Sequence, residues 1–508
     1  MLAAILDAIE DSPHPNPLPG GERESFLKTH PALPLDTRRF PPDFTDRLLA
    51  SFDDLDEMTD GLLVHSENWQ ALNLLLEKYR ERVKCVYIDP PFNSPSTEIV
   101  YENDYKHSSW LSLLADRIAL TNGLLTNGVY FVAIDENELE RLGLLLEETW
   151  FQGWKKVCIA IRHNPQGIQG RNFSHCHEYA YFLYPSDQKK YIGEWAMEEP
   201  DVRNLRDSGL ESDRTDAKNC FYPIIVRDGS IVAIGDVPNA HFHPRGVNEK
   251  NPDGTVSVWP IDTSGREKKW RYARQSVGAI LPKLQVRETK GKYEIYFSKD
   301  IGTVRTLWDD PKFDASEYGT KLLQELFGTR DLDFSYPKSL FTLTETLQVI
   351  TSAQSNEYIL DYFAGSGTTG HAVINLNRED ASTGSAQAAG RRKFILVEMA
   401  NYFDTVLLPR IKKVIFSPEW KDGRPERVAT AEEAERGPRI VKVIRLESYE
   451  DALNNLSFDE ESGQMALQLE DYLLRYMLKW ETRKSETLLN VAQLQNPFAY
   501  KLHIHRDG

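Results

Sequence analysis

The sequence predicts an α/β fold in which a doubly wound, mostly parallel sheet is interrupted by an inserted domain of mixed α+β structure. Short apolar runs typical of buried strands alternate with stretches of helical periodicity, which is the pattern of a parallel sheet covered by helices. This alternation stops near residue 155 and resumes near residue 336, across a segment richer in Gly, Pro, Asn, charges and aromatics. At 508 residues the chain is long enough for two or three domains with separate cores.

The two halves of the predicted sheet occupy residues 44–154 and 336–420. The first half begins with an acidic helical stretch at 44–60, followed by strands at 61–64, 83–88 and 128–134 and helices at 66–82 and 110–125. The second half contains helices at 340–350 and 370–376 and strands at 358–362 and 393–397. Its small-residue tract 381–390, ASTGSAQAAG, is expected to be a loop insertion.

The other ranges are the insert and the two ends of the chain. Residues 1–43 are expected to form a leader that is unfolded at its start, where residues 12–24 read SPHPNPLPGGERE. Residues 155–335 form the insert, with short strand-like pieces such as GKYEIYF at 291–297. Residues 421–508 are expected to be a further α/β region, truncated relative to longer relatives. Their amphipathic stretch 465–480 packs in a core or contacts a second subunit.

Composition bears more on location than on function. No apolar run approaches the length of a membrane span, and the N-terminus lacks the apolar core of a signal peptide. The four cysteines have no paired spacing, which predicts reduced thiols in a cytoplasmic protein. A net charge of −17 does not by itself indicate a nucleic-acid binder, although a local basic surface can still face a polyanion.

The stretch VYIDPPFNS, residues 86–94, ends a predicted strand with an acid, two prolines and an aromatic ring. Proline cannot donate a hydrogen bond to a strand ladder, so the strand stops here. Asp89 and Phe92 are therefore expected to project from its carboxyl end on a stiff loop. Taken alone, the motif also fits an ordinary strand-terminating turn.

A second motif, YILDYFAGSGTTG at residues 358–370, places G-x-G-x-x-G at a strand-to-helix junction. Glycines there allow a tight turn and a close approach of the backbone to a ligand. The pattern also occurs in NAD enzymes and in packing turns, while the absence of a following lysine argues against a P-loop. The next strand ends in Glu398, placed to accept hydrogen bonds from ribose hydroxyls. The small-residue insertion puts it farther from the glycines than the usual ~20 residues.

Together the two motifs resemble the signature pair of DNA amino-methyltransferases, D-P-P-[YFW] and F-x-G-x-G, in the order that is typical of the β class of this family. Further segments resemble the modification subunit of type III restriction systems. They are ENWQALNLL, SSWLSLLADRIAL, NFSHCHEYAYFLY, DASEYGTKLLQELFG, YPKSLF and FILVEMANYFDTVLLPRIKKVI. The similarity runs from about residue 62 to residue 420 and continues more weakly to the end.

The resemblance implies a Rossmann-like methyltransferase fold, S-adenosylmethionine as cofactor and a target-recognition domain in the insert. It assigns catalysis to Asp89, Pro90, Pro91 and Phe92. It assigns cofactor binding to Asp361, Phe363, Ala364, Gly365, Gly367, Thr368 and Glu398, with Lys338 and Ser339 near the cofactor carboxylate and Glu67 near its adenine. Two positions depart from the family pattern. SEN replaces a G-D-N-like loop, so Glu67 equally fits a charged first-turn helix residue, and Phe92 replaces the commoner tyrosine.

The residues of the first motif suit methylation of an exocyclic amine. Such an amine is a poor nucleophile because its lone pair is delocalised into the ring. If Asp89 accepts one amine hydrogen and the Pro90 carbonyl accepts the other, the nitrogen becomes pyramidal and its lone pair can attack a sulfonium methyl group. Phe92 offers a face for stacking against a base flipped out of the duplex. By resemblance, the leading aspartate favours adenine N6 over cytosine N4.

Basic and aromatic side chains interleave in the insert, where residues 264–276 read SGREKKWRYARQS and residues 162–175 read RHNPQGIQGRNFSH. Such side chains can contact phosphates and base edges, although a charge run also fits a solvated face. The predicted DNA-binding residues are Arg162, Arg171, Lys268, Lys269, Trp270, Arg271 and Arg274. No metal site is predicted, because His175-Cys176-His177 and His241-x-His243 lack partners at metal-ligand spacing.

The sequence therefore predicts a site-specific DNA methyltransferase that acts on adenine N6 as part of a restriction-modification system. Its expected partner is double-stranded DNA, and further candidates are a restriction subunit and a second copy of the chain; no membrane partner is expected. Three alternatives stay open. They are a cytosine-N4 methyltransferase, an NAD-dependent oxidoreductase, which has no use for D-P-P-F, and a catalytically inactive DNA-binding specificity subunit.

Overall fold

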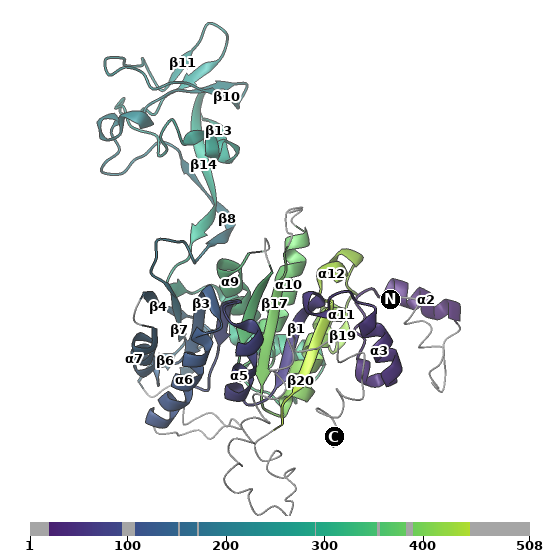
Figure 1. The fold of residues 1–508 in the computed structure, drawn as a ribbon. Coiled ribbons are helices and arrows are strands. Elements are labelled where there is room, and N and C mark those ends of the chain that lie inside the picture. Colours follow the sequence, from purple (N-terminus) through teal and green to yellow (C-terminus); the bar gives the residue numbers. More distant parts are fainter. Residues whose placement is uncertain are drawn as a thin grey trace, which may run out of the picture. The chain divides into compact units, whose positions relative to one another are not determined.

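The computed structural model describes residues 20–93, 107–150, 153–169, 172–289, 291–352, 356–382 and 390–447. The chain divides into two compact units. Unit 1 comprises Met1–Gly193 and Arg305–Gly508, and unit 2 comprises Glu194–Val304. Unit 2 is therefore one continuous insertion in the chain of unit 1 (Figure 1).

Unit 1 is built on a nine-stranded sheet with the strand order β15-β4-β7-β3-β2-β16-β17-β1-β20. Among these described strands only β7 is antiparallel to the others, and it pairs with β3 on one side and β4 on the other. The strands are β1 (Thr59–His65), β2 (Val83–Ile88), β3 (Leu125–Ile134), β4 (Trp154–Ile161), β7 (Glu178–Pro185), β15 (Leu307–Trp308), β16 (Glu357–Asp361), β17 (Arg392–Glu398) and β20 (Ile440–Arg445).

Helices cover both faces of this sheet (Figure 1). They include α3 (Pro42–Ala50), α4 (Leu55–Met58), α5 (Asn68–Tyr79), α6 (His107–Asn122), α7 (Leu139–Trp150), α8 (Leu322–Phe327), α9 (Leu340–Ile350), α10 (Thr368–Ser382), α11 (Leu408–Phe416) and α12 (Ala431–Arg436). The predicted doubly wound, mostly parallel α/β fold is confirmed.

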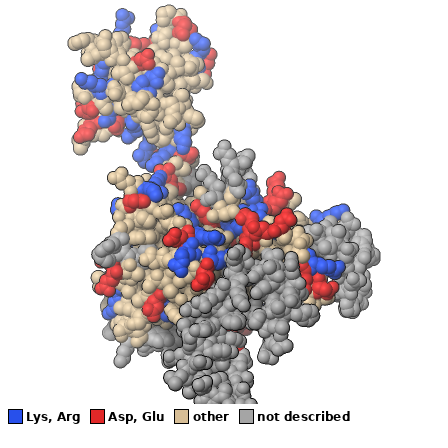
Figure 2. Space-filling model, viewed as in Figure 1, with Lys and Arg blue, Asp and Glu red and all other residues tan. Residues whose placement is uncertain are grey.

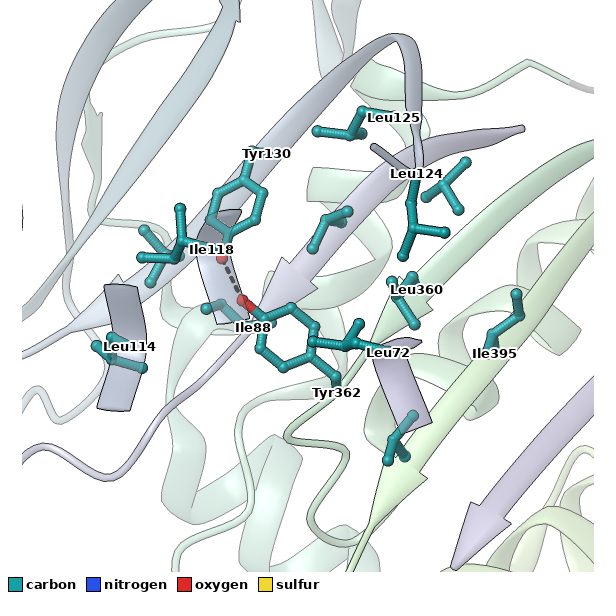
Figure 3. Packing of buried hydrophobic residues seen from close by; sticks show 14 of the residues in the cluster. Leu72, Ile88, Leu114, Ile118, Leu124, Leu125, Tyr130, Leu360, Tyr362 and Ile395 are labelled. Atoms are coloured by element: carbon teal, nitrogen blue, oxygen red, sulfur yellow. Dashed lines mark hydrogen bonds between the residues drawn. The ribbon is translucent and has the colours of Figure 1, made fainter. Parts of the chain in front are cut away.

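The main core lies between the sheet and helices α5 and α6 (Figure 3). Leucine, isoleucine and valine side chains from the helices and strands fill it, as expected for a sheet buried on both faces. Two tyrosine hydroxyls, those of Tyr130 and Tyr362, hydrogen bond to each other at 2.5 Å inside this core. Burial raises the pKa of both well above the usual range, so each stays protonated and available as a donor.

The centre of the sheet joins parts of the chain that lie far apart in sequence. Strands β2 and β16 are parallel neighbours, with Cys85 opposite Ile359 and Val86 opposite Leu360. Parallel neighbours end at the same edge of a sheet, so the loops that follow β2 and β16 emerge side by side.

Unit 2 contains a four-stranded sheet, β10-β9-β12-β11, and a three-stranded sheet, β13-β14-β8. The strands are β8 (Glu194–Asn204), β9 (Ile224–Arg227), β10 (Ser230–Ile234), β11 (Asn248–Lys250), β12 (Val256–Val258), β13 (Leu284–Thr289) and β14 (Lys292–Thr303). Its separate core includes Tyr222, Ile224, Val258, Trp270 and Ile295, each at most 2% exposed.

Several predicted boundaries differ from the structure. Within the predicted insert 155–335, strands β4, β7 and β15 belong to the main sheet, because their apolar side chains pack in its core, and unit 2 itself begins at Glu194. The stretch 44–60 holds two short helices and the start of β1 instead of one helix. The end of the Pro/Gly-rich tract is helical, in α2 (Gly20–Thr29). Strand β20 extends the sheet beyond residue 420.

Other predicted features lie outside the described residues. They are the start of the leader, most of the tract 381–390 and the amphipathic stretch 465–480. In the described part of the chain, no helix combines the length and the apolar character needed to cross a membrane.

Asp60 attaches strand β20 to the sheet. This carboxylate is 3% exposed, and it accepts hydrogen bonds from the backbone N–H of Arg439 at 3.0 Å and from its guanidinium at 2.8 Å. Arg391 and Lys393 lie 3.6 and 3.5 Å from the same carboxylate. One buried acid therefore balances three cations from two other segments.

Substitution Asp60→Asn should destabilise unit 1 by about 3 kcal/mol, because it leaves buried cations without their counterion. The free energy of unfolding in urea measures this loss. Asp53→Asn, at an exposed acid, is the matched control and should change it by less than about 0.5 kcal/mol. Equal effects of the two substitutions would contradict this role for Asp60.

Candidate active site

The D-P-P-F loop leaves the carboxyl end of β2 and is held from two sides. The indole N–H of Trp110 in α6 donates to the Pro91 carbonyl at 2.8 Å. Asn93 ends the loop in the left-handed region, with φ of 57°, and its side-chain amide donates to Glu138 Oε1 at 2.7 Å. Glu138 is fully buried just before α7. These contacts fix the loop that carries Asp89 and Phe92.

Lys338, just before α9, reaches the same loop. Its Nζ lies 3.2 Å from Asp89 Oδ1, forms an ion pair with Glu178 at the start of β7, and lies 4.4 Å from the centroid of the Phe92 ring. The Asp89 contact is not aligned as a hydrogen bond, and Asp89 Oδ1 has no hydrogen-bond partner in the described part of the chain. This oxygen is buried beside Lys338, whereas the Asp89 side chain as a whole is 25% exposed.

The charged groups at this site shift one another's pKa values. Burial raises the pKa of Asp89 to about 6, with Lys338 opposing the rise and Glu178 adding to it. Burial alone would lower the pKa of Lys338, but the carboxylates of Asp89 and Glu178 outweigh it and hold that pKa above the usual range. At neutral pH the cluster is therefore a lysine cation between two acids.

The glycine loop leaves the carboxyl end of β16. Gly365 and Gly367 have φ values of 53° and 81°, which L-residues rarely adopt. A Cβ at Gly365 would lie 3.1 Å from the Phe334 ring, so the backbone there needs the absence of a side chain. Asp361 supports the loop from below, accepting the N–H of Phe363 at 3.0 Å and the hydroxyl of Thr369 at 2.5 Å.

Glu398, at the end of β17, lies beside the glycine loop. It is 4% exposed, and its carboxylate accepts backbone N–H groups from Gly365 at 2.9 Å, Met399 at 2.9 Å and Ala400 at 3.0 Å. A small pocket opens at these strand ends. Its lining residues are Ser66, Asn68, Tyr362, Phe363, Val397, Glu398 and Met399.

Arg410 of α11 lies under the glycine loop. It is fully buried, and its guanidinium donates to the hydroxyls of Ser366 at 2.7 Å and Thr368 at 2.9 Å. Burial lowers the pKa of Arg410 to about 9, which still leaves it a cation at neutral pH. The loop therefore has a fixed positive charge on its inner side.

The sequence profile of the DNA methylase family matches residues 83–407, a range that holds both loops. The chain belongs to the DNA methylase family. It is 25% identical over 394 residues to the Mod subunit of the type III restriction-modification enzyme EcoPI of Escherichia phage P1, covering 67% of this chain and 57% of that protein. It is 28% identical over 384 residues to the type II methyltransferase M.KpnI of Klebsiella pneumoniae, covering 69% and 83%.

Among solved structures, the crystal structure of the M1.HpyAVI–SAM complex aligns with 69% of this chain and 98% of that one, at 12% identity and a TM-score of 0.33. The predicted resemblance to DNA amino-methyltransferases and Mod subunits is confirmed by the family match and the sequence relatives.

Residues predicted from both motifs gather at one edge of the sheet, after β2, β16 and β17. Three other predicted cofactor residues have structural contacts of their own. Lys338 contacts Asp89, as described above. Ser339 begins α9 and donates to the Lys312 carbonyl at 2.7 Å. Glu67 begins α5, accepts two backbone N–H groups there and pairs with Arg117 at 2.7 Å.

Some of the predicted DNA-binding side chains have structural roles, which corrects that assignment. Trp270 is 2% exposed in the core of unit 2, so it cannot stack on a base. Lys268 is 9% exposed and pairs with Asp213 at 2.5 Å. On the face of unit 2 seen in Figure 2, Lys and Arg are interspersed with Asp and Glu and form no single basic patch.

The remaining predicted residues of this group are partly exposed or lie elsewhere. Arg271 and Arg274 have side chains 35% and 37% exposed, and Lys269 is 18% exposed. Arg162 belongs to unit 1 and donates to the Asp309 carbonyl at 2.6 Å. Arg171 lies outside the described residues.

Sequence reasoning missed Glu178 and Glu138. Glu178 lies in the segment NFSHCHEYAYFLY, where the two histidines drew attention to metal binding. In the structure, His177 contacts the Tyr179 hydroxyl at 2.9 Å and His175 pairs with Glu136 at 3.0 Å. The described residues contain no group of three or more His, Cys, Asp or Glu side chains that could hold a metal ion.

The pH dependence of stability should report the buried carboxyl of Asp361. Its pKa is raised to about 7 from an ordinary 3.8, chiefly by burial. Between these values the folded protein binds a proton that the unfolded chain has released, so stability falls as the pH rises from about 4 to 7 and then levels off.

In Asp361→Asn this part of the fall, on the order of a few kcal/mol, should be absent. The free energies of unfolding of wild type and variant, measured from pH 4 to 8, test this. Parallel curves would show that Asp361 does not titrate in this range.

Proposed function

We propose that this chain is a site-specific DNA methyltransferase that transfers a methyl group from S-adenosylmethionine to N6 of adenine. The observation that carries the proposal is the parallel pairing of β2 and β16, which sets the D-P-P-F loop beside the F-A-G-S-G loop. The names of the relatives, a Mod subunit of a restriction-modification enzyme and a type II methyltransferase, support methyl transfer. The chain spans 57% of the phage Mod subunit, and its activity and partners are therefore inferred.

The residues at the ends of β16 and β17 fit S-adenosylmethionine. When bound, it supplies an electrophilic methyl group on a sulfonium. The left-handed Gly365 and Gly367 let the backbone approach a ligand closely. The Glu398 carboxylate accepts three backbone N–H groups, which fix it beside the glycine loop, where it would meet the ribose hydroxyls of the cofactor. The cation of Arg410 polarises the hydroxyl of Thr368, which favours a carboxylate above the loop.

The loop after β2 holds the acceptor amine. The Asp89 carboxylate, whose side chain is 25% exposed, and the Pro90 carbonyl accept the two amine hydrogens, so the nitrogen lone pair turns toward the methyl donor. The clamp of Asn93 and Trp110 on this loop keeps both acceptors in place before the base arrives. Phe92 lies flat against the flipped base and replaces the stacking that the base loses on leaving the duplex.

Adenine N6 is the preferred target, and cytosine N4 is the second candidate. The motif begins with aspartate, as in the adenine enzymes of the family that it resembles. The Mod subunits of the type III enzymes EcoPI, EcoP15I and StyLTI are among the relatives. The profile that matches the chain is that of a family named for both N6 and N4 methylation. Nucleoside analysis of methylated DNA decides between them.

Unit 2 is the proposed target-recognition domain, because it is inserted between the two halves of the catalytic unit and folds on its own core. Double-stranded DNA is its proposed ligand. A restriction subunit is the proposed protein partner, which the printed names of the Mod relatives support.

Asp89→Ala should lower methyl transfer by about 10²- to 10³-fold, because one of the two amine acceptors is lost. Purified protein is incubated with methyl-labelled S-adenosylmethionine and DNA, and the DNA is digested to nucleosides. Label from wild type is expected in N6-methyladenosine, and label in N4-methylcytosine would select the second candidate.

Two controls accompany this test. Asp53→Ala, at an exposed acid, should transfer as wild type does. Binding of S-adenosylhomocysteine by Asp89→Ala should stay within about twofold of wild type, since the acid lies on the acceptor side. Undiminished transfer by Asp89→Ala would remove Asp89 from the catalytic site.

Arg271→Ala should weaken DNA binding and reduce the slope of log affinity against log salt by about 0.9, the value for one lost phosphate contact. Fluorescence anisotropy at several salt concentrations measures the slope. Arg227→Ala removes the same charge from β9 of unit 2, at a side chain 51% exposed, and should leave the slope unchanged. Equal slopes for the two variants would reject Arg271 as a phosphate contact.

A further inference from the structure

We infer that Lys338, held by Glu178, positions Asp89 and Phe92 for the target base and does not bind the cofactor carboxylate. This inference rests on the methyl transfer proposed above. It differs from what the family resemblance implied for Lys338, and it gives Glu178 a role that neither motif indicated.

The contacts of the Lys338 ammonium lie on the acceptor side of the site. It lies 3.2 Å from Asp89 Oδ1, pairs with Glu178 and covers one face of Phe92 at 4.4 Å from the ring centroid. Of the three ammonium donors, one is hydrogen bonded to Glu178, and Asp89 and the Phe92 ring lie around the same ammonium. Its side chain is only 12% exposed. Little of it is left for a carboxylate on the cofactor side.

The backbone around Lys338 is fixed in place. Tyr336 has a φ of 61°, a conformation that a non-glycine residue keeps only when its surroundings determine it. A Cβ at Gly319 would lie 2.3 Å from the Pro337 carbonyl, so the segment packs directly against the backbone of Gly319. Ser339 then begins α9 and bonds to Lys312. The lysine is therefore presented to Asp89 from a rigid turn.

Glu178 prevents a one-to-one ion pair between Lys338 and Asp89. The Glu178 carboxylate is 4% exposed, and it forms a hydrogen-bonded ion pair with Lys338, whereas the Asp89 contact is longer and unaligned. Because the ammonium donates its hydrogen bond to Glu178, the Asp89 carboxylate, whose side chain is 25% exposed, stays able to accept a hydrogen bond from the amine. The cation still lies close enough to keep the Asp89 carboxylate oriented.

The same arrangement fixes the stacking face of Phe92. An ammonium over one face of an aromatic ring is attracted to it when both are shielded from water. Since Lys338 occupies that face, a base cannot stack on it, and the ring also packs against the main core. Lys338 thus aligns two features of acceptor recognition, the hydrogen-bond acceptor and the stacking surface.

The charged groups that face Asp89 come from five elements. They are Lys338 before α9, Glu178 of β7, Asp135 at the end of β3, Asp361 of β16 and, beside Glu178 and Lys338, His163 after β4. Lys338 lowers the pKa of Asp89 and Glu178 raises it. The ionised Asp89 is a stronger acceptor of an amine hydrogen than the protonated form, so the acidic limb of the pH profile of kcat/KM should report this residue. Loss of Lys338 and loss of the Glu178 charge should therefore move that limb in opposite directions.

The test compares Lys338→Met, Lys338→Arg and Glu178→Gln with wild type, and Lys78→Met serves as the control. Lys78 is also 12% exposed and ion-paired, but its partner Asp56 lies outside the site. Methyl transfer to duplex DNA is measured from pH 5 to 9, together with the affinity for S-adenosylhomocysteine by calorimetry. Lys338→Met should move the acidic limb up by about 1 to 3 pH units and lower kcat by at least about tenfold. Lys338→Arg should keep the acidic limb near its wild-type pH. Glu178→Gln should move the limb to lower pH, and Lys78→Met should leave it at the wild-type position.

The outcomes separate this inference from the proposed function. If Lys338→Met keeps the wild-type limb and loses cofactor affinity, Lys338 is a cofactor contact and the inference is overturned. If wild type transfers no methyl group to DNA, the proposed function has failed. The interaction between Lys338 and Asp89 is then measured from the free energies of unfolding. Unfolding free energies of Lys338→Met, Asp89→Asn and the double variant should be non-additive; additive values would overturn the inference as well.

Discussion

The pairing of β2 with β16 is the contact on which the rest of the site depends. Each strand is followed by a loop that alone does not identify a site. The loop after β2 is a proline turn, and the loop after β16 is a glycine turn. Parallel pairing makes both loops emerge at the same edge, with Cys85 opposite Ile359 in the ladder. The neighbouring strand β17 then adds Glu398 to that edge. An acceptor site and a donor site become adjacent because of backbone hydrogen bonds in the sheet.

Burial of charge is the second constraint on this edge. Asp89, Glu178 and Asp361 are acids placed where water is scarce, and Lys338 and Arg410 are the cations nearest to them or to the glycine loop. Isolated buried charges are costly, and each of these groups is matched by an ion pair or by hydrogen bonds. Asp361 is an example of an acid matched by hydrogen bonds. Burial raises its pKa, and hydrogen bonds from Phe363 and Thr369 limit the rise.

Local patterns in the sequence were enough to predict five strands of the nine-stranded sheet, namely β1, β2, β3, β16 and β17. The expected bounds of β2 and α9 agree with the structure, because apolar periodicity and a proline or serine boundary define them. Strand β7 was assigned to the insert because its antiparallel pairing with β3 and β4 involves distant residues that no local pattern reveals. For the same reason the contact between Lys338 and Glu178 had no signal in the sequence. The run at 264–276 showed composition only, and it could not show that Trp270 points inward.

The insertion of unit 2 between Gly193 and Arg305 also has a consequence for biosynthesis. As the chain leaves the ribosome, β2 is made early, while its neighbour β16 appears only after the whole of unit 2. Until then the β16-facing edge of β2 has no partner in the ladder, and pairings of such long range form slowly. Unit 2, with a continuous chain and its own core, can fold during this interval. The nascent protein would thus have a folded unit 2 before β16 and the glycine loop that follows it have been made.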